Sequence, residues 1–211
     1  MRGLLTHHNS QFCTIATIKK QFSTNLQSLK IVITGGPSTG KSSLLKALSR
    51  YKVPCFEEIS RQVTLEARQH GVSQLFVEDP LHFSQKLLDA RIKQYEASLV
   101  VENPFVFFDR GIPDVKAYLN FAKTPHPDFF HQAALDLRYD CVFILPLWEE
   151  IYTTDSERYE SFSQALEIQW HLQSYYNTLG YEPIEVPIGI VEERIAFIKH
   201  KLEAAFQLSP F

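Results

Sequence analysis

Residues 35–42 spell Gly-Gly-Pro-Ser-Thr-Gly-Lys-Ser, which matches the pattern G-x-x-x-x-G-K-[ST] at every fixed position. This pattern constrains the fold because it functions as a loop between a strand and a helix. Its glycines let backbone N–H groups turn toward one anion, its lysine reaches the terminal phosphates of a nucleotide, and its hydroxyl binds Mg²⁺. The motif therefore predicts a phosphate-binding (Walker A) loop, with a Gly/Ser-rich turn that binds nothing as the alternative.

The flanking residues supply the context that such a loop requires. Residues 30–34 form a short apolar, β-branched run that is typical of a buried strand. Residues 42–50 carry apolar side chains at 44, 45 and 48, which is helical spacing. We therefore predict nucleotide binding by the whole loop and the start of the helix, namely Gly35, Gly36, Pro37, Ser38, Thr39, Gly40, Lys41, Ser42 and Ser43.

The rest of the chain alternates between strand and helix signals. Apolar runs predict further strands at residues 53–57, 105–109, 141–145 and 181–186. Helical patterns cover residues 59–69, 80–101, 113–122, a segment that ends at 138, then 162–179 and 190–206, and a loop is expected at 70–79. This alternation predicts an α/β fold with a parallel sheet covered by helices on both faces. Ligands of such sheets bind beyond the carboxyl ends of the strands.

Asp109 and Arg110 follow the apolar residues of the predicted strand at 105–109. A carboxylate at this place is suited to bind the Mg²⁺ of the nucleotide. Most mechanical ATPases place a glutamate after this aspartate, whereas here the next residue is arginine. An arginine suits an anionic substrate or the charge of a transition state, so Arg110 is a candidate catalytic and acceptor-binding residue. A structural Asp–Arg pair at the strand end is the alternative.

Glu57 and Glu58 end the second predicted strand and reach the same edge of the sheet. A carboxylate there can accept the proton of a hydroxyl that attacks the γ-phosphate, and we assign this role to Glu58. Arg61 lies three residues later on the same helical face, and Asp114 lies near the start of the helix after Asp109. Both are candidate acceptor-binding residues. For the acidic residues, capping of a helix N-terminus is the alternative.

A polar and charged segment at about residues 146–161 has no core pattern. In phosphoryl-transfer enzymes such a segment can fold over the nucleotide as a lid, exclude water and deliver an arginine. Arg158 is its main basic residue and is therefore a candidate catalytic residue. A solvated surface loop is the alternative.

The charge distribution limits the kinds of partner that the chain is expected to bind, and the cysteine content indicates its cellular compartment. Residues 1–56 hold eight Lys or Arg and no Asp or Glu, whereas the remainder holds 13 basic and 24 acidic residues. The loop lies in the basic part, which suits an anionic ligand, but a net charge of −3 does not favour nucleic-acid binding. Three widely spaced cysteines indicate a reducing, cytoplasmic setting. No apolar run is long enough to predict a membrane span.

The first 28 residues are rich in Ser and Thr, free of acids and without clear periodicity. We interpret them as a non-essential extension rather than a transit peptide, because Arg2 is their only arginine. Residues 29–211 then form one domain that contains the lid segment.

Several stretches together resemble the family of predicted ATPases that is related to the NadR kinase domain and includes the TRPL-translocation-defect protein. They are the loop at 35–42 and residues 58–61, 107–118, 139–152, 158–161 and 191–194. The most specific is Asp-Arg-Gly-Ile-Pro-Asp at 109–114, and the resemblance covers roughly residues 30–205. It implies a P-loop NTPase fold like that of nucleoside and nucleotide kinases, with five parallel strands in the order 2-3-1-4-5.

The resemblance also implies roles for particular residues. Gly40, Lys41 and Ser42 would bind phosphate and Mg²⁺. Asp109 and Arg110 would correspond to the Asp-Arg pair of the kinases, and Arg158 would correspond to a lid arginine. NadR's own domain phosphorylates ribosylnicotinamide, while other members are known only as ATP- or GTP-binding. The resemblance therefore describes the nucleotide half of the site better than the acceptor half.

Two hypotheses of different classes follow. The first is a cytoplasmic phosphotransferase that binds Mg²⁺ and ATP, with GTP as the alternative, and moves the γ-phosphate to a small hydroxyl-bearing acceptor such as a nucleoside. Ser42 and Asp109 would hold the metal, and Lys41 and Arg158 would hold the charge of the transferring group. The second is a nucleotide-dependent switch with slow hydrolysis and a protein or lipid partner. The absence of Asn-Lys-x-Asp weakens its GTP version. An ATPase component of a toxin–antitoxin, phage-defence or repair system is a third possibility that no residue favours.

Overall fold

The computed structural model describes residues 27–69, 75–152 and 160–211. Its strands are β1 (Leu29–Thr34), β2 (Cys55–Phe56), β3 (Phe105–Asp109), β4 (Cys141–Ile144) and β5 (Ile184–Glu185). Its helices are α2 (Lys41–Ser49), α3 (Ser60–Gln69), α4 (Leu75–Glu78), α5 (Pro80–Ser98), α6 (Ile112–Phe121), α7 (Phe129–Asp136), the 3₁₀ turn η1 (Glu149–Ile151), α8 (Phe162–Thr178) and α9 (Val191–Phe206). None of the helices in these ranges is long and apolar enough to cross a membrane.

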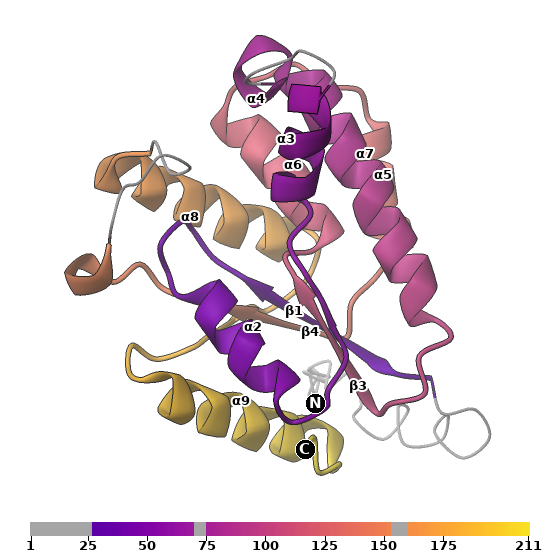
Figure 1. The fold of residues 1–211 in the computed structure, drawn as a ribbon, viewed down its shortest axis with the longest axis vertical. Helices are drawn as coiled ribbons and strands as arrows, with labels where there is room; N and C mark the ends of the chain where they lie inside the picture. Colours follow the sequence, from indigo (N-terminus) through magenta and orange to yellow (C-terminus); the bar gives the residue numbers. More distant parts are fainter. Residues whose placement is uncertain (1–26, 70–74, 153–159) are drawn as a thin grey trace, which may run out of the picture.

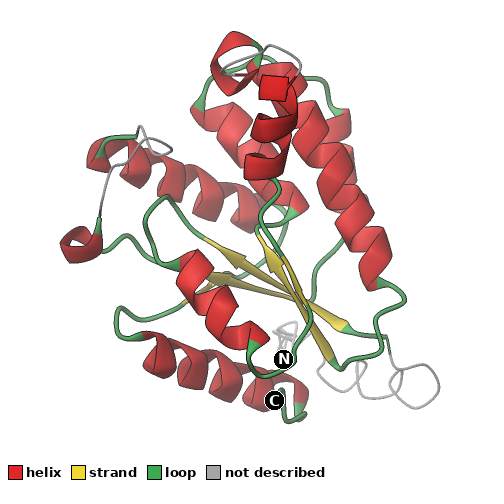
Figure 2. Cartoon of the chain, in the orientation of Figure 1, coloured by secondary structure: helices red, strands yellow, loops and turns green. Residues whose placement is uncertain are grey.

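The strands pair in parallel in the order β2-β3-β1-β4-β5 (Figure 1). Helices cover both faces of the sheet: α2 and α9 lie on one side, and α5, α6 and α8 lie on the other (Figure 2). This arrangement confirms the predicted α/β fold and its strand order.

The central strands are continuous apolar runs because both of their faces are buried. In β1, Ile31 and Ile33 pack in the core under α2 and α9, whereas Val32 between them packs in the core under α5, α6 and α8. All three side chains are fully buried. Successive side chains of a strand point to opposite faces, so a sheet covered on both sides needs apolar residues at every position.

The strand register brings the carboxyl ends of the strands to one edge of the sheet. Ile33 of β1 lies opposite Asp109 of β3, and Phe108 of β3 lies opposite Phe56 of β2. On the other side of β1, Thr34 pairs with the last residue of β4. The loops that follow these four strands therefore begin next to one another, as expected for a ligand-binding edge.

Four predicted elements differ clearly from the structure. The two outer strands, β2 and β5, each keep only two residues of their predicted runs, because an edge strand pairs with a single neighbour. Residues 75–78 form α4 although a loop was predicted at 70–79; Leu75 is buried there against Ile59 and Val63. The helix predicted at 80–101 ends at Ser98, and Val100 beyond it is exposed.

Candidate active site

The predicted phosphate-binding loop connects β1 to α2. Its backbone has a positive φ at Gly35 (142°), Ser38 (56°) and Gly40 (85°). A Cβ on Gly35 would lie 2.6 Å from the carbonyl oxygen of Leu145, so this position requires glycine. The loop leads into the first turn of α2, where free backbone N–H groups and the helix dipole favour an anion.

Lys41 is buried at the centre of this loop. Its Nζ donates to the carbonyl oxygens of Gly35 and Gly36 at 2.9 and 2.5 Å and to Oγ1 of Thr39 at 3.2 Å. Burial, aided by the charge of Arg110, lowers the pKa of Lys41 to about 7. No carboxylate of the described residues forms an ion pair with it. A phosphate would give this ammonium a charged acceptor in place of neutral carbonyls.

Asp109 ends β3 and is 4% exposed. Its Oδ1 is buried and has no hydrogen-bond partner among the residues that the structure describes. Burial, with the nearby charge of Glu58, raises the pKa of the carboxyl. A buried acceptor without a partner is costly unless it binds something. Mg²⁺ prefers oxygen ligands, so Asp109 and the hydroxyl of Ser42 are a donor set that fits this ion. Within the described ranges no three His, Cys, Asp or Glu side chains gather to hold a metal by themselves.

Arg110 has a left-handed backbone with φ of 68°. Such a conformation costs a residue with a side chain about 1 kcal/mol. Three main-chain contacts hold it in place. The N–H of Arg110 donates to the carbonyl of Ile33 at 3.0 Å, and Nη1 of Arg91 donates to the carbonyls of Asp109 and Arg110 at 3.0 and 2.9 Å. Arg91 extends from α5 and is 2% exposed.

The side chain of Arg110 connects the phosphate-binding loop to the segment that follows β2. Its Nε donates to Oε1 of Glu58 at 3.3 Å, and its Nη1 donates to the carbonyl of Gly35 at 3.1 Å and to Oδ1 of Asp114 at 3.3 Å. The guanidinium also lies over the ring of Tyr118, 5.2 Å from its centre. The structure thus brings a cation and a carboxylate directly beside the phosphate-binding loop.

Glu58 accepts hydrogen bonds from Arg110 and from the hydroxyl of Ser60, the latter at 2.8 Å. Burial alone would raise the pKa of Glu58, but the charges of Arg110 and Lys41 outweigh burial and lower it to about 2. A carboxylate with this pKa stays ionised at neutral pH and is a weak base. It can accept a hydrogen bond from an attacking hydroxyl, which suits a loose transition state that needs little proton abstraction beforehand.

We expect the stability that Glu58 contributes to depend on pH. Its pKa in the folded protein, about 2, lies below the ordinary 4.5, so its contribution is present above pH 4.5 and is lost as the pH falls toward 2. The difference in unfolding free energy between the wild type and Glu58→Gln should therefore shrink by about 1 kcal/mol from pH 6 to pH 3.5. Urea titrations at the two pH values measure this. Glu167→Gln, at an exposed position of α8, is the control, and equal shrinkage for both variants would contradict the expectation.

Both carboxylate oxygens of Asp114 accept hydrogen bonds from protein groups. Its Oδ1 accepts from the hydroxyl of Thr34 and from Arg110, and its Oδ2 accepts from the N–H of Gly111 and the hydroxyl of Tyr176. It therefore caps α6 and holds Arg110 in position, with 1% of its surface exposed. These contacts favour the capping alternative over the predicted acceptor-binding role.

Gly111→Ala should disturb this network. A Cβ at position 111 would lie 2.6 Å from the hydroxyl of Tyr176, which donates to Asp114, and 3.1 Å from Val32. We expect a loss of about 1–3 kcal/mol in unfolding free energy, measured by urea denaturation. The control is Gly189→Ala, whose Cβ would come closest to the flexible side chain of Glu193. Equal stability of both variants would mean that Tyr176 moves aside freely.

Two further side chains hold the loop from outside and were not predicted. Gln169 of α8 accepts from the N–H of Gly36 at 2.8 Å and donates to the carbonyl of Leu145 at 3.2 Å. Arg194 of α9 donates from Nη1 to the carbonyl of Thr39 at 2.8 Å. A charged residue on the buried face of a helix was the available signal for Arg194, and also for Arg91 on α5.

A pocket of about 400 Å³ opens beside the loop. Its walls come from the loop and α2, from the segment after β4, and from the start of α9, namely Gly40, Ser43, Trp148, Ile151, Gly189, Ile190, Val191, Glu192 and Arg194. Aromatic and apolar walls with a few polar groups are typical of a small-molecule site.

The structure brings only some of the predicted site residues together. Lys41, Glu58, Asp109 and Arg110 come together, whereas Ser42 and Ser43 are exposed at the start of α2. Arg61 is exposed on α3, and its role stays a prediction. Arg158 lies outside the described residues, as do residues 153–159 of the predicted lid and residues 1–26 of the predicted extension.

A family model described as an AAA domain matches residues 30–194, which is most of the chain. The chain belongs to this AAA-domain family. The match confirms the P-loop family expected from the sequence. A search of curated proteins finds no match.

Solved structures similar to this AAA domain include nucleoside and nucleotide kinases. Deoxyadenosine kinase from M. mycoides, with the products dCMP and dCDP, matches with a TM-score of 0.61 and 16% identity over 83% of this chain and 100% of that one. Thymidylate kinase from Candida albicans matches with a TM-score of 0.65 and 17% identity over 84% and 92%. NadR in complex with NR matches with a TM-score of 0.66 and 18% identity over 88% of this chain and 53% of NadR. At such identities the likeness shows the fold alone.

Proposed function

We propose that this AAA domain is a phosphotransferase that transfers the γ-phosphate of Mg²⁺-bound ATP, or of GTP in its place, to a hydroxyl of a small acceptor. The observation that carries the proposal is the contact of Arg110 with both Glu58 and Gly35. It places a cation and an ionised carboxylate next to the loop, where a second substrate can meet the terminal phosphate. Simple nucleotide binding requires no such pair.

Each residue then has a role. The N–H groups of the loop and Lys41 bind the phosphates, and Ser42 and Asp109 hold Mg²⁺, which shields the charge of the phosphates when bound. Arg110 stabilises the charge of the transferring group. Glu58 accepts a hydrogen bond from the acceptor hydroxyl and orients it for attack.

A nucleoside is the first acceptor to test. The kinase structures that this chain matches have nucleosides, nucleotides and NR in their descriptions, and the fold supports the same class of chemistry. The free thiols of Cys55 and Cys141 support the proposal of a cytoplasmic location. Arg158 and the lid at 146–161 stay predictions.

Incubation of the protein with γ-labelled ATP and GTP against a panel of nucleosides, nucleotides and small metabolites tests the proposal. We expect transfer to at least one acceptor well above the release of phosphate to water. Lys41→Met is the negative control and should remove that transfer. Hydrolysis alone across the panel would reject the phosphotransferase and support the nucleotide-dependent switch.

A further inference from the structure

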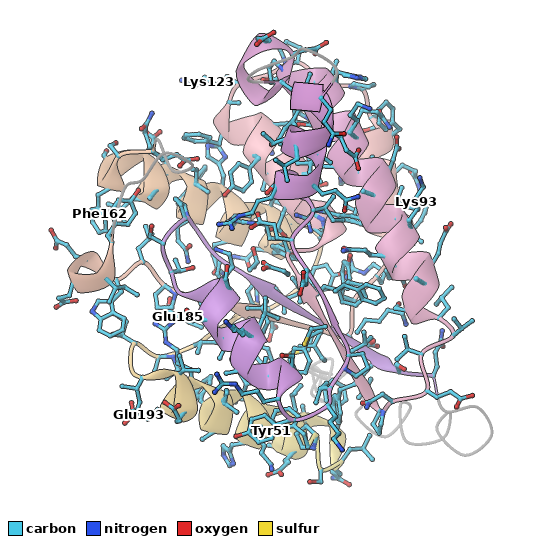
Figure 3. The ribbon with its side chains drawn as sticks, viewed as in Figure 1. Tyr51, Lys93, Lys123, Phe162, Glu185 and Glu193 are labelled. Carbon is cyan, nitrogen blue, oxygen red and sulfur yellow. The ribbon has the colours of Figure 1, made fainter. Side chains whose placement is uncertain are left out.

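Arg194 is a charged residue on the buried face of α9. Ile195, Ile198 and Leu202 of the same helix are core residues, and Arg194 itself is 3% exposed. Glu193, the preceding residue, marks this end of α9 at the lower left of Figure 3. Burial lowers the pKa of Arg194, and no carboxylate in the described part of the chain pairs with it. A buried charge without a counterion is costly, so this position calls for a ligand.

Two contacts fix how the guanidinium lies. Its Nη1 donates to the carbonyl of Thr39 at 2.8 Å, and its Cζ lies over the Trp148 ring, 5.6 Å from the ring centre. The other two nitrogens, Nε and Nη2, are buried and have no hydrogen-bond partner among the described residues. The free hydrogen-bonding capacity of Arg194 is therefore concentrated on one edge.

That edge has a definite shape. Nη1 is on the Cδ side of the planar guanidinium, so Nε–H and one N–H of Nη2 point the same way from the opposite edge. Two parallel donors suit a pair of adjacent acceptor atoms. Carboxylates, phosphates and the O6/N7 edge of guanine offer such a pair.

The pocket beside Arg194 favours a base among these ligands. It measures about 400 Å³, and the walls contributed by Trp148, Ile151 and Ile190 are aromatic or apolar. Such walls suit a flat ring and not a solvated phosphate. Gly40 and Ser43 belong to the same pocket, so the pocket is continuous with the loop that we propose to hold the phosphates of the nucleotide.

We propose that Arg194 recognises the nucleobase through O6 and N7 of guanine and so makes GTP the preferred nucleotide. This inference rests on the proposed function. Adenine places its N6 amino group next to N7, so a donor would face a donor at the Arg194 edge. One N–H would then stay buried without a partner, which is the usual basis of such discrimination.

The wild-type protein with base analogues gives the first test and needs no variant. Dissociation constants of GTP, ITP, 7-deaza-GTP and ATP are measured by calorimetry with Mg²⁺ at one salt concentration. ITP keeps O6 and N7, so it should bind within about threefold of GTP, while ATP should bind at least about tenfold more weakly. 7-Deaza-GTP, which lacks N7, should fall between them. Equal affinities for GTP and ATP would overturn the inference.

The second test changes the arginine. In Arg194→Met the ratio of the ATP and GTP dissociation constants should fall to near one, and in Arg194→Lys, which has a single donor centre, it should be intermediate. Arg138→Met is the matched control, because Arg138 precedes β4 at the opposite end of the sheet and packs on Tyr181. It should keep the wild-type ratio.

The outcomes separate this inference from the proposed function. If Arg194→Met weakens GTP and ATP by the same factor, Arg194 acts through the loop or the phosphates that both nucleotides share, and the base assignment is wrong. If the wild type binds no triphosphate, the proposed function fails as well. If Arg194→Met does not fold, the analogue series on the wild type decides alone.

Discussion

Replacement of Lys41 by methionine should lower γ-phosphate transfer by at least about 10²-fold, the usual effect of removing one group that stabilises transition-state charge. Its ammonium is held at the centre of the loop by the carbonyls of Gly35 and Gly36. Methionine has a similar volume, so the buried position stays filled while the charge is lost. The initial rate of phosphate transfer from labelled nucleotide to the acceptor that reacts fastest measures the effect.

Lys46→Met is the control for this prediction. Lys46 lies on the same helix, α2, but is exposed, so its replacement should leave the rate within about twofold of the wild type. Thermal unfolding of both variants shows whether the fold is kept. If Lys41→Met retains more than a tenth of the wild-type rate while folded, Lys41 does not stabilise the transferring phosphate.

Replacement of Arg110 by lysine should reduce transfer by about 10²- to 10³-fold and change nucleotide affinity far less. The guanidinium contacts Glu58, Gly35 and Asp114 at the same time, and a single ammonium cannot reproduce this geometry. The rate of transfer and the nucleotide dissociation constant are measured separately. Their separate changes distinguish action on the transferring group from general damage to the loop.

Arg138→Lys is the control for Arg110→Lys, since Arg138 lies at the opposite end of the sheet. It should leave both quantities within about twofold of the wild type. If Arg110→Lys weakens nucleotide binding as much as it slows transfer, Arg110 supports the loop and has no direct part in the chemistry.

The parts of the site that follow local rules could be predicted from the sequence. The loop has a fixed spacing, and Asp109 and Arg110 directly follow a continuous apolar run, so both could be placed at strand ends. The strand order came from the family resemblance, because pairing between distant strands is not encoded in local periodicity. Glu58 was found for the same reason as Asp109, since parallel strands end at one edge.

The contacts that hold the site together could not be predicted in this way. Arg194 and Thr39 are 155 positions apart and meet only because α9 packs next to α2. Asp114 has the same sequence signal whether it caps a helix or faces a ligand, and only the structure shows the hydroxyls of Thr34 and Tyr176 donating to it. The left-handed backbone at Arg110 has no residue signature, because arginine does not favour that conformation.

The central claim is that the loop, Asp109 and the Arg110–Glu58 pair form one site for two substrates. A crystal structure with Mg²⁺ and a non-hydrolysable triphosphate tests it most directly. The account predicts phosphates on backbone N–H groups of the loop and of the start of α2, Asp109 bound to the metal directly or through water, and an acceptor-sized cavity beside the Arg110–Glu58 pair that faces the γ-phosphate. A γ-phosphate that faces open solvent, with Glu58 and Arg110 pointing away from it, would contradict the account.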